Sequence, residues 1–211
     1  MRQHVNPLSK VFQVIEPIPA LEQIFNEPTK PLHLDVGCGS GTFLLNLANQ
    51  NKNWNYIGLE IREKLVHNAK FKLKNESIDN LFFAFGNANY LIQDCLGKFP
   101  ADILFSVSFN FPDPWFKKKH HKRRIVQPQL IHTISQLMVN GGYISIKSDI
   151  EELFRYMDMT IMNSKSFINY VYQDNEMFDS HNPLNLKTNR ENYVIQKKLK
   201  VFERLYKKII F

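Results

Sequence analysis

A glycine-rich turn and an acid in the following strand are the first residues whose spacing indicates chemistry. The turn reads Asp35-Val36-Gly37-Cys38-Gly39-Ser40-Gly41-Thr42-Phe43 and lies between an apolar run and a helix-period segment. Glycines allow a backbone to turn tightly and to approach a ligand closely. Glu60 ends the next apolar run, where Rossmann-type sheets hold a ribose through its hydroxyls. Together these features predict a cofactor that contains a nucleoside.

The spacing of the glycines separates two classes of cofactor. Gly37, Gly39 and Gly41 form G-x-G-x-G, whereas dinucleotide sites use G-x-G-x-x-G. This turn resembles motif I of S-adenosylmethionine-dependent methyltransferases, so a methyl donor is favoured over a nicotinamide. Two structural alternatives stay open: Asp35 could cap the following helix, and Glu60 could be the N-cap of the next one.

Two more segments follow predicted strands at the sheet edge where open α/β folds bind ligands. Asn87 is the candidate contact for an adenine amino group, with an ordinary turn asparagine as the alternative. Residues 108–116 read Ser-Phe-Asn-Phe-Pro-Asp-Pro-Trp-Phe. The prolines fix φ on both sides of Asp113 and aim its carboxylate and the Trp115 indole into the cleft. A stiff loop around a buried tryptophan is the alternative.

A dense basic run follows directly: Lys117-Lys118-Lys119-His120-His121-Lys122-Arg123-Arg124. Such runs are usually solvated faces. Beside the expected cleft, however, this run would attract and orient a phosphate backbone. The sequence therefore predicts a nucleic-acid substrate, and RNA in particular, because side chains can reach the unpaired bases of its loops.

From about residue 31 onward, short apolar runs alternate with helix-period segments, which is the pattern of βαβ units and a parallel sheet. Strands are predicted over 32–36, 55–59, 81–85, 102–109, 143–147, 168–173 and 201–211, and helices over 42–50, 62–75, 125–139 and 150–163. Residues 1–30 contain Pro7, Pro17, Pro19 and Pro28. They predict an irregular arm that docks on the domain formed by 31–211 or stays mobile.

Composition excludes several classes of protein. A chain of 211 residues with 44% hydrophobic side chains suits one folded domain and not a disordered segment. A net charge of +7 suits a polyanionic partner. Two isolated cysteines argue against a disulfide framework and a structural metal. No signal-peptide core and no apolar run of membrane-spanning length is present, so no membrane contact is expected.

These motifs together resemble one family. They are F-P-D-P-W-F-K-K-K-H-H-K-R-R with Pro128 following, the loop 35–41, Gly58-Leu59-Glu60-Ile61-Arg62, Asn87, Lys147-Ser148-Asp149 and Thr188-Asn189-Arg190-Glu191. They resemble the tRNA (guanine-N7-)-methyltransferases over nearly the whole chain, and the opening residues 2–8 look like the cyanobacterial and plastid branch. The resemblance implies a single Rossmann-like class I S-adenosylmethionine-dependent methyltransferase domain of α/β class, with a mostly parallel seven-stranded sheet flanked by helices. It also implies a monomer or homodimer in the bacterial cytoplasm or the plastid stroma.

The resemblance further implies roles for single residues. The cofactor S-adenosylmethionine would be contacted by Asp35, Gly37, Gly39, Glu60, Asn87 and Asp113, of which Asp113 would be catalytic. The tRNA substrate would be bound by Lys117, Asp149, Thr188 and Glu191, although Thr188 and Glu191 equally form a capping box that needs no function. The RNA would also meet Lys118, Lys119, His120, Lys122, Arg123 and Arg124, and no metal is implied. The implied target is guanine 46 in the variable loop.

The implied reaction needs no strong base. Guanine N7 carries a free lone pair and can attack the sulfonium methyl without first losing a proton. The product purine is cationic, and the Asp113 carboxylate would stabilise that charge as it develops. Two rivals stay open: an exocyclic-amine methyltransferase, disfavoured because Pro112-Asp113-Pro114-Trp115 lacks a doubled proline after the acid, and an RNA-binding module that kept the fold but lost activity.

Overall fold

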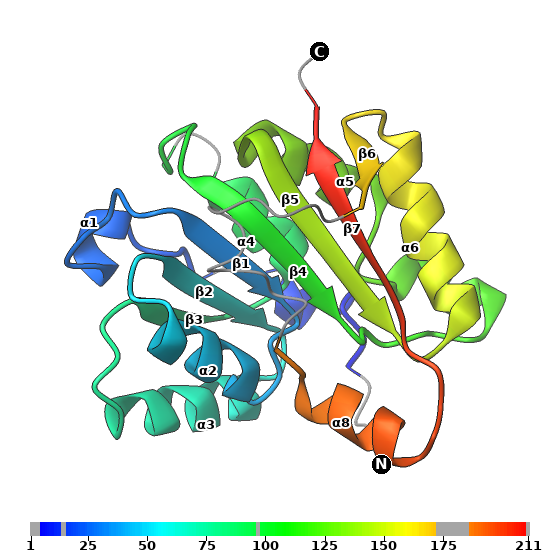
Figure 1. The fold of residues 1–211 in the computed structure, drawn as a ribbon, viewed down its shortest axis with the longest axis horizontal. Helices are drawn as coiled ribbons and strands as arrows, with labels where there is room; N and C mark the ends of the chain where they lie inside the picture. Colours follow the sequence, from blue (N-terminus) through cyan, green and yellow to red (C-terminus); the bar gives the residue numbers. More distant parts are fainter. Residues whose placement is uncertain (1–4, 14–15, 96–97, 172–185, 210–211) are drawn as a thin grey trace.

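One seven-stranded sheet organises the molecule, with strand order β3-β2-β1-β4-β5-β7-β6 (Figure 1). The computed structural model describes residues 5–13, 16–95, 98–171 and 186–209. Parallel pairing joins β1 (Leu32–Val36), β2 (Asn55–Glu60), β3 (Leu81–Phe85), β4 (Leu104–Asn110) and β5 (Met138–Ser148). The strand β7 (Phe202–Lys208) runs antiparallel to both of its neighbours, β5 and β6 (Phe167–Tyr170). The expected α/β sheet is confirmed, but it is mixed because β7 reverses direction.

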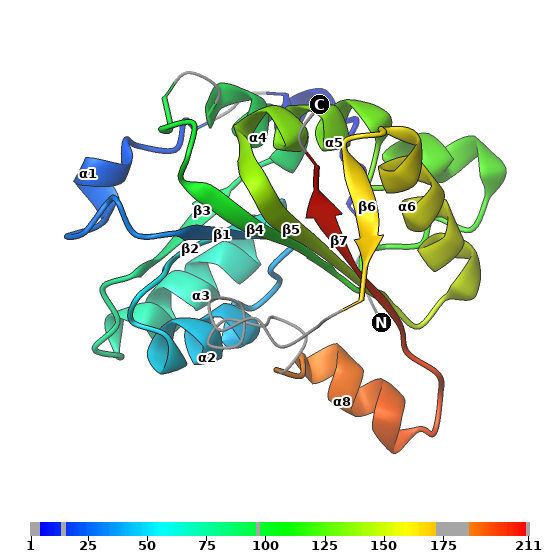
Figure 2. The same ribbon diagram turned by 45° about the horizontal axis from the view of Figure 1, so that its top comes forward.

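Helices cover both faces of this sheet (Figures 1 and 2). On one face lie α2 (Thr42–Gln50) and α3 (Glu63–Lys74), and on the other α4 (Ala88–Cys95), α5 (Pro128–Leu137) and α6 (Glu151–Asn163). The larger hydrophobic core joins β1, β4 and β5 to the second group, and a smaller core lies under α2 and α3. A further helix, α8 (Asn189–Gln196), lies beside the carboxyl ends of the parallel strands.

Most predicted elements are confirmed, and the differences have local causes. The predicted helix 125–139 begins only at Pro128, because a residue before proline is disfavoured in helical conformation. It ends at Leu137, since β5 starts at Met138 and is much longer than the predicted strand 143–147. The short helix α4 and the 3-10 helix η2 (Lys118–Arg123) were not predicted. Residues 172–173 and 210–211 of two predicted strands lie outside the described residues.

The N-terminal arm docks on the domain. Its short elements are η1 (Lys10–Phe12) and α1 (Leu21–Ile24). Ile18, Leu21 and Phe25 are buried in the larger core, which fixes the second half of the arm through apolar contact. Of the two expectations for the arm, docking is what these residues show.

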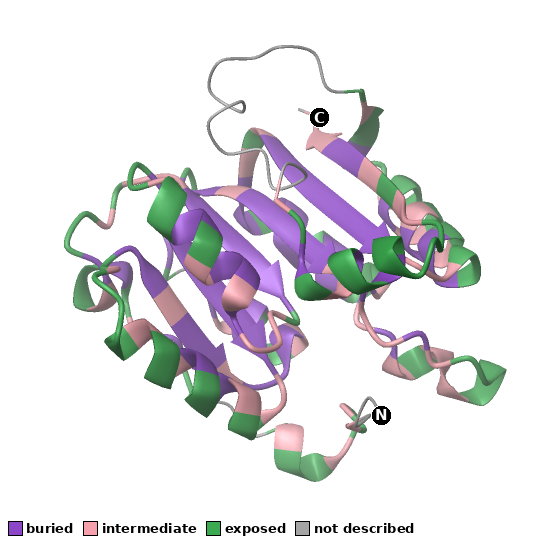
Figure 3. Ribbon diagram, turned by 60° about the horizontal axis from the view of Figure 1, so that its bottom comes forward, coloured by how far each residue is buried: buried purple, intermediate pink, exposed green. Residues whose placement is uncertain are grey.

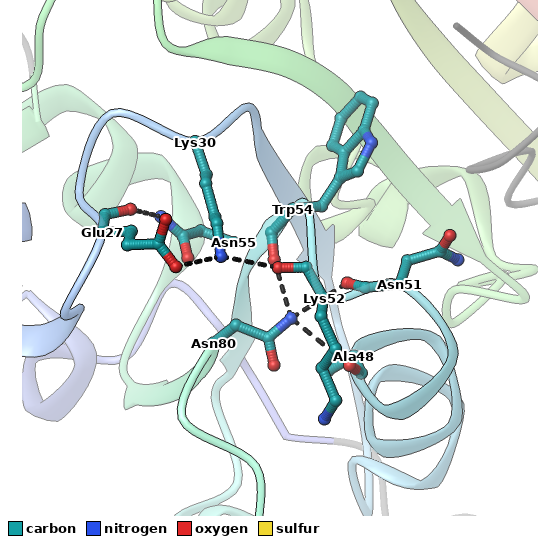
Figure 4. Close-up of polar contacts among 8 residues, drawn as sticks. All are labelled: Glu27, Lys30, Ala48, Asn51, Lys52, Trp54, Asn55 and Asn80. Atoms are coloured by element: carbon teal, nitrogen blue, oxygen red, sulfur yellow. Dashed lines mark hydrogen bonds and ion pairs between the residues drawn. The ribbon is translucent and has the colours of Figure 1, made fainter. Parts of the chain in front are cut away.

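Polar side chains close the amino end of the sheet, opposite the carboxyl ends of β1 and β2 (Figure 4). The Asn80 amide donates to the carbonyl oxygens of Ala48, Asn51 and Trp54, at 3.3, 3.0 and 2.7 Å. Asn55 donates to the Glu27 carbonyl at 2.8 Å, so the end of the arm is tied to β2. These asparagines satisfy backbone groups that turns would otherwise leave buried without a partner.

Candidate functional site

A cavity of about 290 Å³ opens at the carboxyl ends of β1, β2 and β4. Turns after these strands supply most of its wall, and the arm and the start of α8 complete it. All six predicted cofactor residues line it: Asp35, Gly37, Gly39, Glu60, Asn87 and Asp113. Its other lining residues include Pro7, Arg62, Asn110, Trp115, Arg123, Thr188 and Arg190. The structure therefore brings together residues that the sequence places more than a hundred positions apart.

The glycines of the turn serve two different purposes. Gly37, Gly39 and Gly41 all have positive φ, at 86°, 59° and 74°. A Cβ at Gly37 or Gly39 would meet no atom within 4 Å, so the backbone there is open toward the cavity. A Cβ at Gly41 would lie 2.6 Å from the Phe83 ring, so this glycine allows α2 to pack closely on the sheet. The first two glycines leave room for a ligand.

Glu60 is buried at the end of β2 and holds the turn in place. Its Oε2 accepts from the Gly39 N–H at 2.9 Å and from Arg62 Nη2 at 3.0 Å. Its Oε1 accepts from Arg62 Nε at 2.9 Å and from the Arg62 backbone N–H at 3.0 Å. The N-cap of α3 is Arg62, so the alternative that Glu60 caps this helix is wrong.

Asp35 is buried opposite Glu60 at the end of β1. Its Oδ1 accepts from Ser108 Oγ at 2.6 Å and from Asn110 Nδ2 at 3.1 Å. Burial raises the Asp35 pKa to about 6, although these two hydrogen bonds lower it, and the Glu60 charge raises it further. The N-cap of α2 is Gly41 and has no side-chain bond, so the capping alternative for Asp35 is also wrong.

A buried polar chain continues from Asp35 into the protein. Ser108 Oγ lies 3.0 Å from His33 Nε2, and His33 Nδ1 lies 2.9 Å from Ser106 Oγ. Burial lowers the His33 pKa to about 3, so the ring is neutral near pH 7. Because the Ser108 hydroxyl proton is donated to Asp35, its oxygen accepts from Nε2–H, and Nδ1 then accepts from Ser106. This order fixes the direction in which Ser108 donates to the Asp35 carboxylate.

The segment that carries Asp113 is held in a strained conformation. Phe111 and Trp115 have φ of 50° and 45°, a region that costs non-glycine residues about 1 kcal/mol or more. The Phe111 N–H donates to the Lys147 carbonyl at 2.8 Å. At the other end, Arg124 Nε donates to the Pro114 carbonyl at 2.8 Å. These contacts keep Asp113 and Trp115 at the cavity wall, as the prolines predicted.

The basic run divides into an exposed and a buried part. Lys117, Lys118, Lys119 and Lys122 are exposed, and His120 is half-buried. The Arg123 guanidinium lies 5.0 Å from the centre of the Trp115 ring, and both residues line the cavity. Arg124 is buried, donates to Glu152 at 2.7 Å and lies over the Tyr156 ring at 4.8 Å. Arg124 was expected to contact RNA, but its position shows that it ties this segment to α6.

Two of the residues predicted to bind substrate, Asp149 and Glu191, form ion pairs near the start of α8. Thr188 and Glu191 form the capping box, with the Glu191 N–H donating to Thr188 Oγ1 at 3.0 Å. Glu191 is also paired with Lys147 at 2.9 Å, and both side chains are buried. Asp149 is paired with Arg190. Of the four predicted substrate residues only Thr188 lines the cavity, so their substrate roles stay predictions.

Several residues of the site were not singled out from the sequence. Arg62, Ser108 and Asn110 orient the two buried acids, and Pro7 accepts from the Asn87 amide at 3.1 Å. A signal for Ser108 was available: alternate residues of a strand share a face, and Ser106, Ser108 and Asn110 recur with that period.

Comparison with known proteins decides the family. A family model described as "Putative methyltransferase" matches residues 29–204. A tRNA (guanine-N(7)-)-methyltransferase of Prochlorococcus marinus (strain MED4) is 54% identical over 99% of this chain and 100% of its own length. One from Synechococcus elongatus is 40% identical over 98% of this chain and 95% of its own. The chain belongs to the tRNA (guanine-N7-)-methyltransferase family.

Membership of this family agrees with the fold and with the cavity. The structure of an rRNA methylase from Streptococcus thermophilus superposes with a TM-score of 0.52 over 90% of this chain and 92% of that chain, at 16% identity, which shows a common Rossmann-like fold. The family's methyl donor is S-adenosylmethionine, which carries an ammonium and a sulfonium. The buried carboxylates of Asp35 and Glu60 and the open backbone at Gly37 and Gly39 fit such a cationic nucleoside.

Other site types are not found in the part of the chain that the structure describes. No three His, Cys, Asp or Glu side chains gather there as a metal cluster, and no helix there could span a bilayer. Cys38 and Cys95 are both free thiols.

Proposed function

We propose that the protein transfers a methyl group from S-adenosylmethionine to N7 of a guanine in tRNA, at position 46 in the variable loop. One observation carries the proposal: the cavity with buried acids suited to a cationic nucleoside is also lined by Arg123, which belongs to a basic segment suited to a phosphate backbone. The names of the relatives support tRNA and guanine N7, and the motif resemblance supports position 46.

The residues of the cavity would divide the work as follows. Bound S-adenosylmethionine supplies the methyl group as an electrophile. Glu60 would accept from the ribose hydroxyls, since its carboxylate is already oriented by Gly39 and Arg62. Asp35 would face the positive charge of the methionine part, and Asn87 the adenine.

Asp113 would act on the guanine. It lies on a segment fixed at both ends, so its carboxylate needs no rearrangement to meet a base that enters beside Trp115. As N7 takes the methyl group, positive charge develops on the purine, and a nearby carboxylate stabilises it. No proton leaves guanine N7 before the transfer, so the reaction requires no general base. The carboxylates of the cavity instead suit the positive charge that develops on the purine.

The test is methyl transfer from labelled S-adenosylmethionine to unmodified tRNA, followed by chain cleavage at N7-methylguanine. Cleavage at position 46, and its absence in a transcript with adenosine at 46, is the expected result. Label incorporated without that cleavage would contradict the assignment to N7. No incorporation, despite measured S-adenosylmethionine binding, would favour an RNA-binding module without activity.

A further inference from the structure

The outer surface of α8 and its connection to β7 combines an exposed aromatic ring with cations. Tyr193 is 48% exposed. The Arg190 guanidinium lies 5.2 Å from the centre of its ring, and Lys197 Nζ lies 5.9 Å from it. Lys198 and Lys200 follow and are exposed. We call these five residues the α8 surface; the proposed function does not use it.

The positive charge of the α8 surface comes from Lys197, Lys198 and Lys200, which form no ion pair with an acid among the described residues; the nearby acids face other cations. Glu191 is buried against Lys147, and Glu203 lies 3.6 Å from the same lysine. Asp149 is paired with Arg190, which in turn lies over the Tyr193 ring. The Asp149 pair therefore fixes the guanidinium, and the guanidinium limits the movement of the ring.

The α8 surface is continuous with the cavity. Thr188, Asn189 and Arg190 line the cavity at the start of the helix, and the later residues of α8 are not among its lining residues. Figure 3 shows α8 with most of its residues exposed, on the side where the parallel strands end. A polynucleotide with one base in the cavity would thus pass over either the basic segment 117–124 or the α8 surface, or over both.

We propose that the α8 surface binds the tRNA strand beside the target base, with Lys197, Lys198 and Lys200 on phosphates and Tyr193 stacked on an unpaired base. The proposal rests on the proposed tRNA substrate. Exposed lysines bind phosphates, and the affinity of such binding falls as the salt concentration rises. An exposed aromatic ring stacks on any base, because every base has a π-face. Because the Tyr193 ring lies beside two cations, this surface can offer a base stacking contact and phosphate contacts together.

The first experiment compares two triple variants that remove equal charge. The test variant is K197Q/K198Q/K200Q, and the control is K52Q/K74Q/K165Q. All three control lysines are exposed and lie in turns or helix ends away from the cavity. Each triple contains one residue with positive φ, Lys198 at 55° and Lys165 at 60°, so backbone strain is matched. Both variants should bind S-adenosylmethionine like the wild type, which shows that they are folded.

The measurement is tRNA affinity as a function of salt concentration. For the test variant we expect affinity to fall about 10-fold or more near 0.15 M salt, and the salt slope to decrease by about 2, since each phosphate contact contributes about 0.7–0.9. The control should change much less. Equal curves for the two triples would overturn the proposal. If the wild type itself does not bind or methylate tRNA, the proposed function has failed, which is a different result.

The second experiment isolates the ring. Tyr193→Phe should keep wild-type affinity for tRNA, and Tyr193→Leu should lose about 5-fold or more, because leucine has no π-face for a base. Tyr193 is half exposed, so neither change should alter folding. Wild-type affinity in Tyr193→Leu would overturn the stacking contact.

Discussion

The two ends of the sheet use buried polar residues in different ways. At the amino end, the Asn80 amide donates to three backbone carbonyls between Ala48 and Trp54, and Asn80 is not among the residues that line the site cavity. At the carboxyl end, Asp35 and Glu60 accept from side chains and N–H groups while they also line a cavity. Burial alone therefore does not mark a functional residue; the kind of partner and the adjoining space do. Variants at the carboxyl end should change binding and turnover, and variants at the amino end should change stability.

The strongest test of the carboxyl end is Asp113→Ala. Loss of the carboxylate should lower kcat on tRNA about 100- to 1000-fold, as loss of one preorganised electrostatic group does elsewhere. Affinity for tRNA should change less than about 3-fold, and the melting temperature should not change. Steady-state methylation gives kcat, filter binding gives the affinity, and thermal unfolding gives the melting temperature. Equal losses in both would mean that Asp113 only docks the substrate.

Glu60→Gln should weaken S-adenosylmethionine binding about 10- to 100-fold. The amide keeps the shape of the side chain but loses the charge that holds Arg62, and charged hydrogen bonds contribute about 1.5–3 kcal/mol. Isothermal titration calorimetry with S-adenosylhomocysteine and S-adenosylmethionine gives the affinities. Glu63→Gln is the matched control, because Glu63 is exposed on α3 three residues away. An unchanged affinity in Glu60→Gln would remove Glu60 from the cofactor site.

At the amino end, Asn80→Ala should lower the free energy of unfolding by about 2 kcal/mol, since it leaves three carbonyls without their donor. For a chain of this size that lowers the melting temperature by about 4–8 °C. Affinity for S-adenosylmethionine should stay at the wild-type value. Asn80→Asp, which keeps the shape but cannot donate, should be at least as unstable. A loss of cofactor affinity without a loss of stability would break the contrast between the two ends.

The smallest expected effect is a pH dependence of cofactor binding. The Asp35 pKa is raised to about 6 by burial, so the carboxylate is charged above pH 6 and neutral below it. Because the cofactor is cationic, its affinity should fall as pH decreases from 7 to 5, by up to about 10-fold. His33 does not titrate in this window, since burial lowers its pKa to about 3. Asp35→Asn should bind more weakly at pH 7 and show no such dependence; an unchanged slope in this variant would assign the effect to another group.

The sequence predicted the part of the molecule that depends on local pattern. The bounds of β1, β3 and α2 follow from apolar runs and glycine positions, and the acids Asp35 and Glu60 follow from their place at the ends of strands. The hydrogen bonds from Ser108 and Asn110 to Asp35 span 73 and 75 residues and depend on the pairing of β1 with β4. The local sequence pattern does not predict which residue of β4 lies beside Asp35 in β1.

The sequence also did not predict which charged residues are buried. Arg124 is the last of a run of cations that all look solvated, yet it is buried against Tyr156 and Glu152, while the four lysines of the run are exposed. Lys147 and Glu191 are far apart in the chain and become a buried pair only when α8 docks on β5. Charged residues are almost never fully buried unless they are paired, so only the structure could single out these three.

The antiparallel strand β7 has a consequence for biosynthesis. It comes after every other described strand in the sequence, yet it lies between β5 and β6, and β6 pairs with it and with no other described strand. During translation the five parallel strands can pair as they emerge, while β6 must wait until residues 202–208 have left the ribosome. A chain truncated before β7 would expose the edge of β5, and open strand edges pair readily with other chains. Premature termination would therefore give an aggregation-prone fragment that still carries the whole glycine turn.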